Sequence, residues 1–410
     1  MNRYKVGIDS HGFRGWSGGI DLIATIAEAI ICKEEIELYL IVEEQSIIEK
    51  TWIFLKNFLE NFGNINKFKN SLENEFQSNK NLLDVFHVVV PNIKIITYKK
   101  TEIAFFNNRE KKMQNAISKK NIDIIMPSYD CNSNVFDIPR IEYIFDFQHK
   151  YFPELFSESE KKYRESFFEK QIKNSKYILV NAQDVKKDIN KFYPDNKCEI
   201  FVLPFKPFQK MNNINGNVSK YDLPSKYYVI SNQFWQHKSH ITAFEALEKI
   251  YNSGITDLHI VCTGKMVDYR NPDYINWLVK TIKSLNCVNN IHFVGFVPKD
   301  DQIEIMRKAI GLIQPTLFEG GPGGGATYNA ICLGKPCLLS DISVNLEASS
   351  YIKSYYFEKK NADSLARLMV EHMNEDSLLD ARIQEIIKKN KVEYGNYIFE
   401  CIKKVIDDSK

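Results

Sequence analysis

The sequence lacks a strong charge of either sign, since its 410 residues carry 54 lysines and arginines against 52 aspartates and glutamates, a net charge of +2. Without a positive field, long-range electrostatics does not draw the chain to nucleic acid, and we expect no such partner. It also lacks an uninterrupted apolar run long enough to span a bilayer, and the apolar run at its start is too short for a signal peptide. We therefore expect a cytoplasmic protein.

Paired cysteines are also missing. The eight cysteines are scattered, form no CxxC pair, and in several cases lie inside apolar runs as small core residues do. No convincing DxD follows a strand-like run. We expect neither a disulfide framework nor a zinc site.

What the sequence does contain is an alternation of short β-branched or aromatic runs with longer helical patterns, typical of a parallel sheet covered by helices. In the first half, strands are expected at residues 4–9, 36–42, 86–90, 93–98, 122–126, 141–145, 177–181 and 199–204, with helices at 20–31 and 47–62 and a polar insertion at 63–84. In the second half, strands are expected at 227–231, 258–264, 291–296, 311–315 and 336–340, with helices starting at His240, Tyr274 and Asp300.

A change of composition divides the chain. Residues 206–225 are rich in turn formers and read as a linker between a first Rossmann-like domain, residues 1–205, and a second, residues 226–385. Residues 386–410 continue an amphipathic pattern of one helix, or of two broken near Gly395, expected to pack back on the first domain. Two doubly wound domains in series bind ligands between their strand ends.

The most unusual stretch is FEGGPGGGATYNAICLGKP, residues 318–336, which follows a strand and runs into a helix. A glycine-rich turn before a helix forms an anion site, because free backbone N–H groups and the helix dipole both point at the turn. A flexible linker is the alternative, but it would not be enclosed so tightly by a strand and an apolar helix. We expect phosphate binding by the backbone around these residues: Gly320, Gly321, Gly323, Gly324, Gly325, Ala326 and Thr327.

The run from Pro315 to Asp341 resembles the signature of retaining, family-four glycosyltransferases, the glycosyl transferases group 1, which have the GT-B fold. The resemblance implies that Glu319 faces the donor sugar. It places Asn329 at the family's second glutamate, which binds the nucleotide ribose. An asparagine oxygen still accepts a hydrogen bond there, without charge assistance.

Further segments are similar to the same family, mainly across residues 228–345. In ISNQFWQHKSH, residues 230–240, Lys238 stands where the family has its diphosphate-binding lysine, while Gln233 replaces the usual arginine and lies beside Asn232. The alternative is that Lys238 is an ordinary solvent-exposed lysine at the start of a helix. The resemblance also implies donor contacts, with the backbone of the last two residues holding the base, from Thr263, Gly264, Lys265, Phe296 and Val297.

The first domain matches the family less closely. Gly18 and Gly19, after the first strand, resemble the loop over the donor phosphates, and Arg14 would add positive charge nearby. His149, in FDFQHKYFPELFS, resembles the family's active-site histidine. A strand-to-helix turn and a structural histidine are the respective alternatives.

The resemblance implies a metal-independent, retaining transfer of a sugar from a UDP- or GDP-linked donor, without a cofactor. The acceptor would be a glycan, a lipid-linked molecule or a protein. The lysine-rich and aromatic stretch at residues 161–177 is compatible with peripheral contact to an anionic membrane, but the favoured interpretation is a solvated amphipathic helix. The alternatives are a sugar-nucleotide epimerase, a phosphorylase, or a catalytically silent GT-B partner subunit. Glycosidase chemistry is disfavoured because no second acid is visible beside Glu319.

Overall fold

The structure is a computed structural model. It describes residues 3–15, 17–44, 82–83, 85–86, 89–91, 93–99, 109–129, 136–209, 211, 214, 216–351, 353–377 and 380–410. The helix expected at residues 47–62 and nearly all of the insertion expected at 63–84 lie outside the described residues.

The first half of the chain forms a parallel sheet of seven strands in the order β3-β2-β1-β4-β5-β6-β7. The strands are β1 Tyr4–Asp9, β2 Ile36–Glu44, β3 Lys94–Lys99, β4 Ile124–Ser128, β5 Arg140–Ile144, β6 Tyr177–Val180 and β7 Glu199–Val202. Every residue of β4, β5 and β6 is buried, as expected for strands covered by helices on both faces. The strand expected at residues 86–90 is wrong, because Phe86 and Val89 are helical.

Helices connect these strands. They are α1 Ser17–Ile30, α4 Arg109–Ser118, α5 Gln148–Tyr151, α6 Glu158–Asn174 and α7 Gln183–Phe192. The start of α6 is set by a capping box, in which the Ser157 hydroxyl accepts from the Glu160 amide and the Glu160 carboxylate accepts from the Ser157 amide.

The second half forms a parallel sheet of six strands in the order β10-β9-β8-β11-β12-β13. These strands are β8 Tyr227–Ser231, β9 His259–Thr263, β10 Ile291–Gly295, β11 Leu312–Gln314, β12 Cys337–Ser340 and β13 Ser354–Phe357. The helices are α8 His240–Asn252, α9 Pro272–Lys283, α10 Lys299–Lys308, α11 Gly324–Cys332, α12 Ser343–Leu346 and α13 Ala362–His372. Strand β13, which pairs with β12, was not expected from the sequence.

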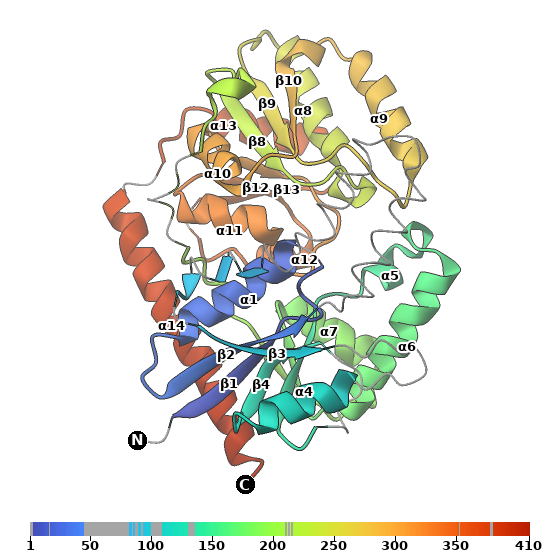
Figure 1. Ribbon diagram of the computed structural model, residues 1–410. Helices are drawn as coiled ribbons and strands as arrows, with labels where there is room; N and C mark the ends of the chain where they lie inside the picture. The colour runs from blue at the N-terminus through green and yellow to red at the C-terminus, as the bar shows by residue number, and fades with distance from the viewer. Residues whose placement is uncertain are drawn as a thin grey trace, which may run out of the picture.

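The last helix, α14 Asp380–Asp407, is continuous through Gly395. A side chain at residue 395 would bring its Cβ to 2.5 Å from the carbonyl oxygen of Ala29, so glycine there allows α14 to lie directly on α1. Lys391 also pairs with Glu28 of α1 at 2.8 Å. Figure 1 shows α14 running along one side of the molecule, from the level of the second sheet down past the first.

The two sheets lie one above the other, with α1 and α11 between them (Figure 1). They touch where the glycine stretch meets the carboxyl ends of β5 and β6, next to Phe145 and Asn181. The expected architecture of two doubly wound sheets facing each other is confirmed.

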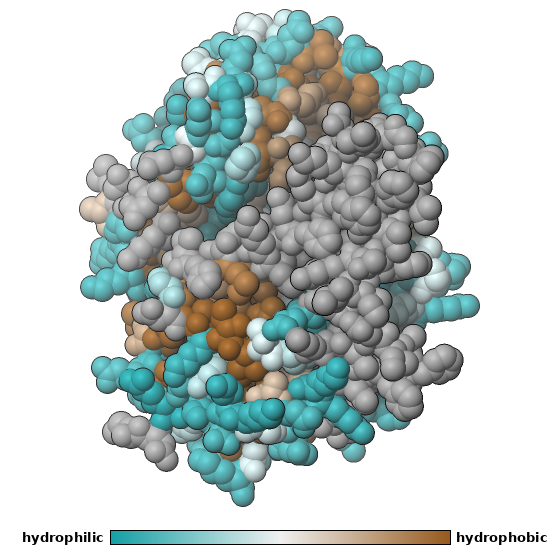
Figure 2. Space-filling model, in the orientation of Figure 1, coloured by the Kyte–Doolittle hydropathy of each residue, from teal (hydrophilic) through white to brown (hydrophobic). Residues whose placement is uncertain are grey.

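Hydrophilic side chains cover most of the coloured surface in Figure 2, and apolar side chains gather at the level of α1. In the part of the chain that the structure describes, none of the helices combines the length and the apolar character needed to cross a membrane.

Candidate functional site

The centre of the candidate site is an ion pair between Lys238 and Glu319. Lys238 ends a short 3₁₀ turn between β8 and α8, and Glu319 lies in the loop between β11 and α11. Lys238 Nζ donates to Glu319 Oε1 at 2.5 Å, and the two side chains are only 12% and 11% exposed. Since β8 and β11 are neighbours in a parallel sheet, their carboxyl ends bring the two residues together.

The side-chain amide of the last residue of β11 hydrogen-bonds to this pair. Gln314, the last residue of β11, donates through Nε2 to Glu319 Oε1 at 3.3 Å and to the carbonyl oxygen of Gly323 at 2.7 Å. Its own side-chain oxygen accepts from the Asn232 amide. Gln314 therefore fixes the carboxylate, the glycine loop and Asn232 relative to one another.

The first two glycines of the loop serve close packing against the first sheet. A Cβ at Gly320 would lie 2.4 Å from the carbonyl oxygen of Phe145, and a Cβ at Gly321 would lie 3.3 Å from Asn181 Cβ. Both positions face the ends of strands in the other half of the molecule. Their bare backbone brings Glu319 close to the first sheet.

The next glycines shape the start of α11. Gly323 and Gly324 have left-handed φ values of 59° and 63°, a conformation that glycine adopts without strain. Their amides are already used, since Gly323 N donates to Asn345 Oδ1 at 2.8 Å and Gly324 N donates to the carbonyl oxygen of Gly321 at 3.2 Å.

Gly325 is different, because a Cβ built there meets nothing within 4 Å. The first amides of a helix have no acceptor within it. With the two preceding amides occupied, Gly325 and Ala326 supply the remaining amides of the first turn of α11, where the helix dipole favours an anion.

Asp146 is an acidic residue near Glu319 that no sequence motif indicated. It follows β5, its Cβ would lie 3.2 Å from a Cβ at Gly320, and its carboxylate accepts from the Gln148 amide at 3.0 Å. Burial raises the pKa of Asp146, and the charges of Arg164, Glu319 and Lys238 act on it as well. The expectation of no second acid near Glu319 is therefore wrong.

His149 lies in α5, inside an aromatic cluster rather than in the open. Its side chain is 1% exposed, its ring centroid lies 5.7 Å from that of Phe168 and 6.2 Å from that of Phe147, and its Nε2 lies 3.4 Å from Glu165 Oε1. Burial lowers the pKa of His149 to about 4, against the opposing effect of Glu165. The imidazole is thus neutral around pH 7.

This burial predicts a loss of stability in acid. The unfolded chain takes up a proton at this histidine near pH 6.5, while the folded chain does so only near pH 4, so the contribution is complete above pH 6.5 and is lost as the pH falls toward 4. The expected slope is about 1.4 kcal/mol per pH unit. His149→Phe should flatten the pH dependence of the unfolding free energy, measured by urea denaturation. If the unfolding free energies of the two proteins changed with pH in parallel, this prediction would be contradicted.

The residues expected at the ends of β8 and β9 lie together, and several of their polar groups are engaged. Lys265 N donates to Gln233 Oε1 at 3.0 Å, and the Thr263 hydroxyl is 2.8 Å from that of Ser231. Gly264 has φ of 115°, and a Cβ there would lie 2.1 Å from the carbonyl oxygen of Asn232. Gln233 thus joins two loops instead of supplying the charge of an arginine.

The other residues of the second half that were expected to bind the nucleotide sugar lie after β10 and on α11. Phe296, after β10, is 69% exposed, and the ammonium of Lys265 lies 5.4 Å from its ring centroid. Val297 is buried. On α11, Thr327 and Asn329 are buried, and the Thr327 hydroxyl donates to the carbonyl oxygen of Gly323 at 2.9 Å. An exposed aromatic ring beside a lysine suits a nucleotide base.

In the first half, Gly18 and Gly19 lie in the first turn of α1, directly after the loop that follows β1. Arg14, in that loop, pairs with Glu43 at 2.8 Å, and Glu43 also accepts from His11 Nδ1 at 2.9 Å. The charge of Arg14 is therefore shared with a buried carboxylate.

Arg270 links the two halves and was also missed by the sequence analysis. Its guanidinium donates to Gln148 Oε1 of the first half at 3.0 Å, lies 3.2 Å from His237 Nδ1, and stacks 4.6 Å from the Trp235 ring. Asp268, two residues away, also accepts from Arg270 Nε at 3.4 Å, but Gln148, His237 and Trp235 lie far from Arg270 in the sequence, so no motif marks it.

Comparison with known proteins agrees with this arrangement. Residues 215–390 match the family model described as Glycosyl transferases group 1. No curated protein matches the chain.

Solved structures match along the full length of the chain. A glycosyltransferase from Rickettsia africae ESF-5 has a TM-score of 0.62 at 17% identity, covering 100% of this chain and 99% of its own. Anabaena Alr3699/HepE, solved in complex with UDP-glucose, has a TM-score of 0.63 at 14% identity, covering 98% and 99%. Sucrose-phosphate synthase from Thermosynechococcus elongatus has a TM-score of 0.58 at 12% identity, covering 98% and 96%. At these identities the likeness shows the fold, which is GT-B.

Proposed function

We propose that this chain, whose residues 215–390 match the family model of the glycosyl transferases group 1, is a GT-B glycosyltransferase that moves a sugar from a UDP- or GDP-linked donor to a glycan, lipid-linked or protein acceptor, with retention of configuration. We assign acceptor binding to residues 1–205 and donor binding to residues 226–385. The observation that carries the proposal is the mostly buried pair of Lys238 and Glu319 in the loops that lead into α8 and α11, with open space beside Gly325 in the first turn of α11.

The donor diphosphate would bind at the start of α11. The ammonium of Lys238 has three donors and gives one to Glu319, so two remain for phosphate oxygens. The amides of Gly325 and Ala326 and the dipole of α11 add further positive potential. The base would lie by Phe296, Lys265 and Val297, and the ribose near Asn329.

The chemical step develops negative charge on the departing diphosphate. The bond between the sugar C1 and the phosphate oxygen breaks, a bond from C1 to the acceptor oxygen forms on the same face, and the acceptor proton passes to a phosphate oxygen. Lys238 and the α11 amides lower the barrier because they face the atoms on which this charge grows. Glu319 would orient sugar hydroxyls, whereas the imidazole expected to help it, that of His149, is buried in its aromatic cluster.

Two glycine substitutions separate phosphate binding from packing. Gly325→Ala should leave stability unchanged or raise it by about 0.5–1 kcal/mol through helix propensity, yet weaken UDP binding about tenfold because its methyl group occupies the phosphate approach. Gly320→Ala should instead cost about 1–3 kcal/mol of stability through its clash with Phe145. Thermal unfolding and calorimetry with UDP measure both effects. Unchanged UDP affinity in Gly325→Ala would place the phosphates elsewhere.

The proposed function is tested by incubating the protein with UDP-glucose and a panel of other nucleotide sugars. A true donor should raise the melting temperature by mass action and, with water taking the sugar in place of the acceptor, slowly release its nucleoside diphosphate. If no nucleotide sugar stabilises the protein or is consumed, the proposal fails. A protein that binds a donor but never consumes it would be a silent partner subunit.

A further inference from the structure

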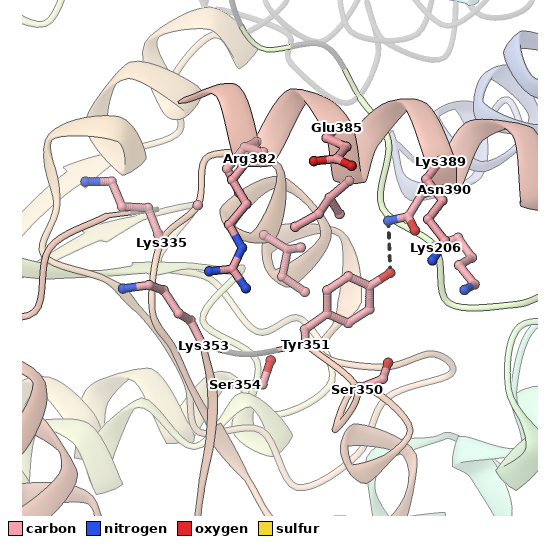
Figure 3. Close-up of a pocket in the computed structure, with 14 residues that line it drawn as sticks. Lys206, Lys335, Ser350, Tyr351, Lys353, Ser354, Arg382, Glu385, Lys389 and Asn390 are labelled. Atoms are coloured by element: carbon pink, nitrogen blue, oxygen red, sulfur yellow. Dashed lines mark hydrogen bonds between the residues drawn. The ribbon is translucent and has the colours of Figure 1, made fainter. Parts of the chain in front are cut away.

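A cavity lies at the other end of α11, away from the candidate donor site. It has a volume of about 430 Å³, within the range of small-molecule sites. Its walls come from the end of α11, the segment before β13, the start of α14 and the segment after β7 (Figure 3). None of the residues assigned to donor binding lines it.

The charged residues of this pocket are mostly basic. One carboxylate, Glu385, stands among five cations: Lys206, Lys335, Lys353, Arg382 and Lys389. Carboxylates outside the lining pair with some of them, since Glu375 pairs with Lys353 and Glu393 pairs with Lys206. An excess of positive charge remains on Lys335 and Arg382.

Lys335 and Arg382 each have N–H groups that no residue of the described chain accepts from. Arg382 makes no ion pair or hydrogen bond with any residue of the described chain, and Figure 3 shows it reaching from α14 into the space near Lys335, Lys353 and Tyr351. Lys335 Nζ donates to the carbonyl oxygen of Ala309 at 2.8 Å and keeps two further N–H groups. Burial lowers the pKa of Lys335, and the nearby charges of Lys353 and Arg307 act in the same direction.

Other groups suit the rest of a small ligand. Ser354 lines the pocket with a buried hydroxyl that a ligand oxygen can contact. Tyr351 is held by Asn390 of α14, whose side-chain amide donates to the tyrosine hydroxyl at 3.0 Å. Ile331, Ile383 and Ile386 provide an apolar wall. The first turn of α14 adds the positive end of its dipole.

We propose that this pocket binds a small phosphate monoester, with the phosphate between Arg382, Lys335 and Lys353 and the remainder of the molecule against Tyr351 and the isoleucines. Arginine and lysine make charge-assisted hydrogen bonds to phosphate oxygens, and Arg382 has its full set of donors available. Because α11 has its first turn at the donor site and its last at this pocket, one helix connects the two. The proposal does not depend on the reaction at the donor site.

The test is calorimetry with glycerol 3-phosphate and inorganic phosphate on the full chain, without nucleotide. Arg382→Gln should weaken binding about tenfold, as the loss of a charge-assisted contact does. Glu385→Gln should strengthen binding severalfold, because it removes the one opposing charge of the lining. Lys388→Gln, the same charge change on an exposed residue of α14 outside the pocket, should bind as the unmodified protein does.

A parallel assay with vesicles containing phosphatidic acid separates two sources of the same phosphate group. Binding to vesicles but not to free esters, lost in Arg382→Gln, would support the phosphate site and identify a lipid headgroup as its source. No binding to any probe, or equal binding by Arg382→Gln and Lys388→Gln, would overturn the proposal. Phosphate binding at the donor site would be the same in Arg382→Gln and Lys388→Gln, because both leave that site intact, so it cannot produce the expected difference between them.

Discussion

Replacing Lys238 by methionine should lower kcat by about two to three orders of magnitude while the protein stays folded. Methionine keeps the length of the lysine side chain but removes the cation that faces the departing diphosphate, and losses of this size follow removal of one well-placed charge-stabilising donor. The variant also leaves Glu319 buried without its partner, which should cost roughly 3 kcal/mol of stability. Turnover of the nucleotide sugar and urea denaturation measure the two effects.

Two further variants keep these effects apart. In the double variant Lys238→Met with Glu319→Gln no unpaired charge remains, so stability should return while turnover stays low. Lys249→Met changes an exposed lysine of α8 that pairs with Asp363 at 2.9 Å, and it should have no effect on kcat. Normal sugar transfer by folded Lys238→Met would remove the diphosphate role of this lysine.

Glu319→Gln should affect transfer much more than nucleotide binding. Glutamine still accepts hydrogen bonds from Lys238 and Gln314, so the loop should keep its shape, but it lacks the charge that orients the sugar hydroxyls. We expect kcat to fall about a hundredfold. The Kd for UDP, which has no sugar, should change less than about threefold, a small effect in free energy.

Comparing the change in UDP affinity with the change in turnover tests this prediction. Equal losses of UDP affinity and of turnover would mean that Glu319 acts on the diphosphate, through Lys238, and not on the sugar. Glu371→Gln is a suitable control, since Glu371 is an exposed carboxylate of α13.

Much of the fold could be predicted because buried parallel strands are short apolar runs between helical patterns. The rule fails where packing overrides local composition. The apolar residues 86–90 fit a strand pattern, but Phe86 and Val89 are helical. Gly395 suggested a break, whereas contact with Ala29 stabilises a continuous α14. Strand β13 is half-exposed at a sheet edge, so its short pattern carries little signal.

The candidate site follows the same division. Lys238 and Glu319 could be predicted because each lies in a motif at the end of a strand, and parallel strands bring such positions together. Asp146 and Arg270 could not, because their roles depend on contacts between the two halves: Asp146 lies beside Gly320, and Arg270 donates to Gln148. The close approach of Gly320 and Gly321 to the first sheet was missed for the same reason.

The contact of α14 with α1 affects how the chain folds during synthesis. Ile23 and Ile26 of α1 share a buried core cluster with Ile398 and Ile402 of α14, which leave the ribosome long after α1. Until then this apolar face of the nascent first half is uncovered and open to aggregation or to chaperones. Stopping translation before Gly395 should therefore yield an insoluble product, even though every strand of both sheets has already been made.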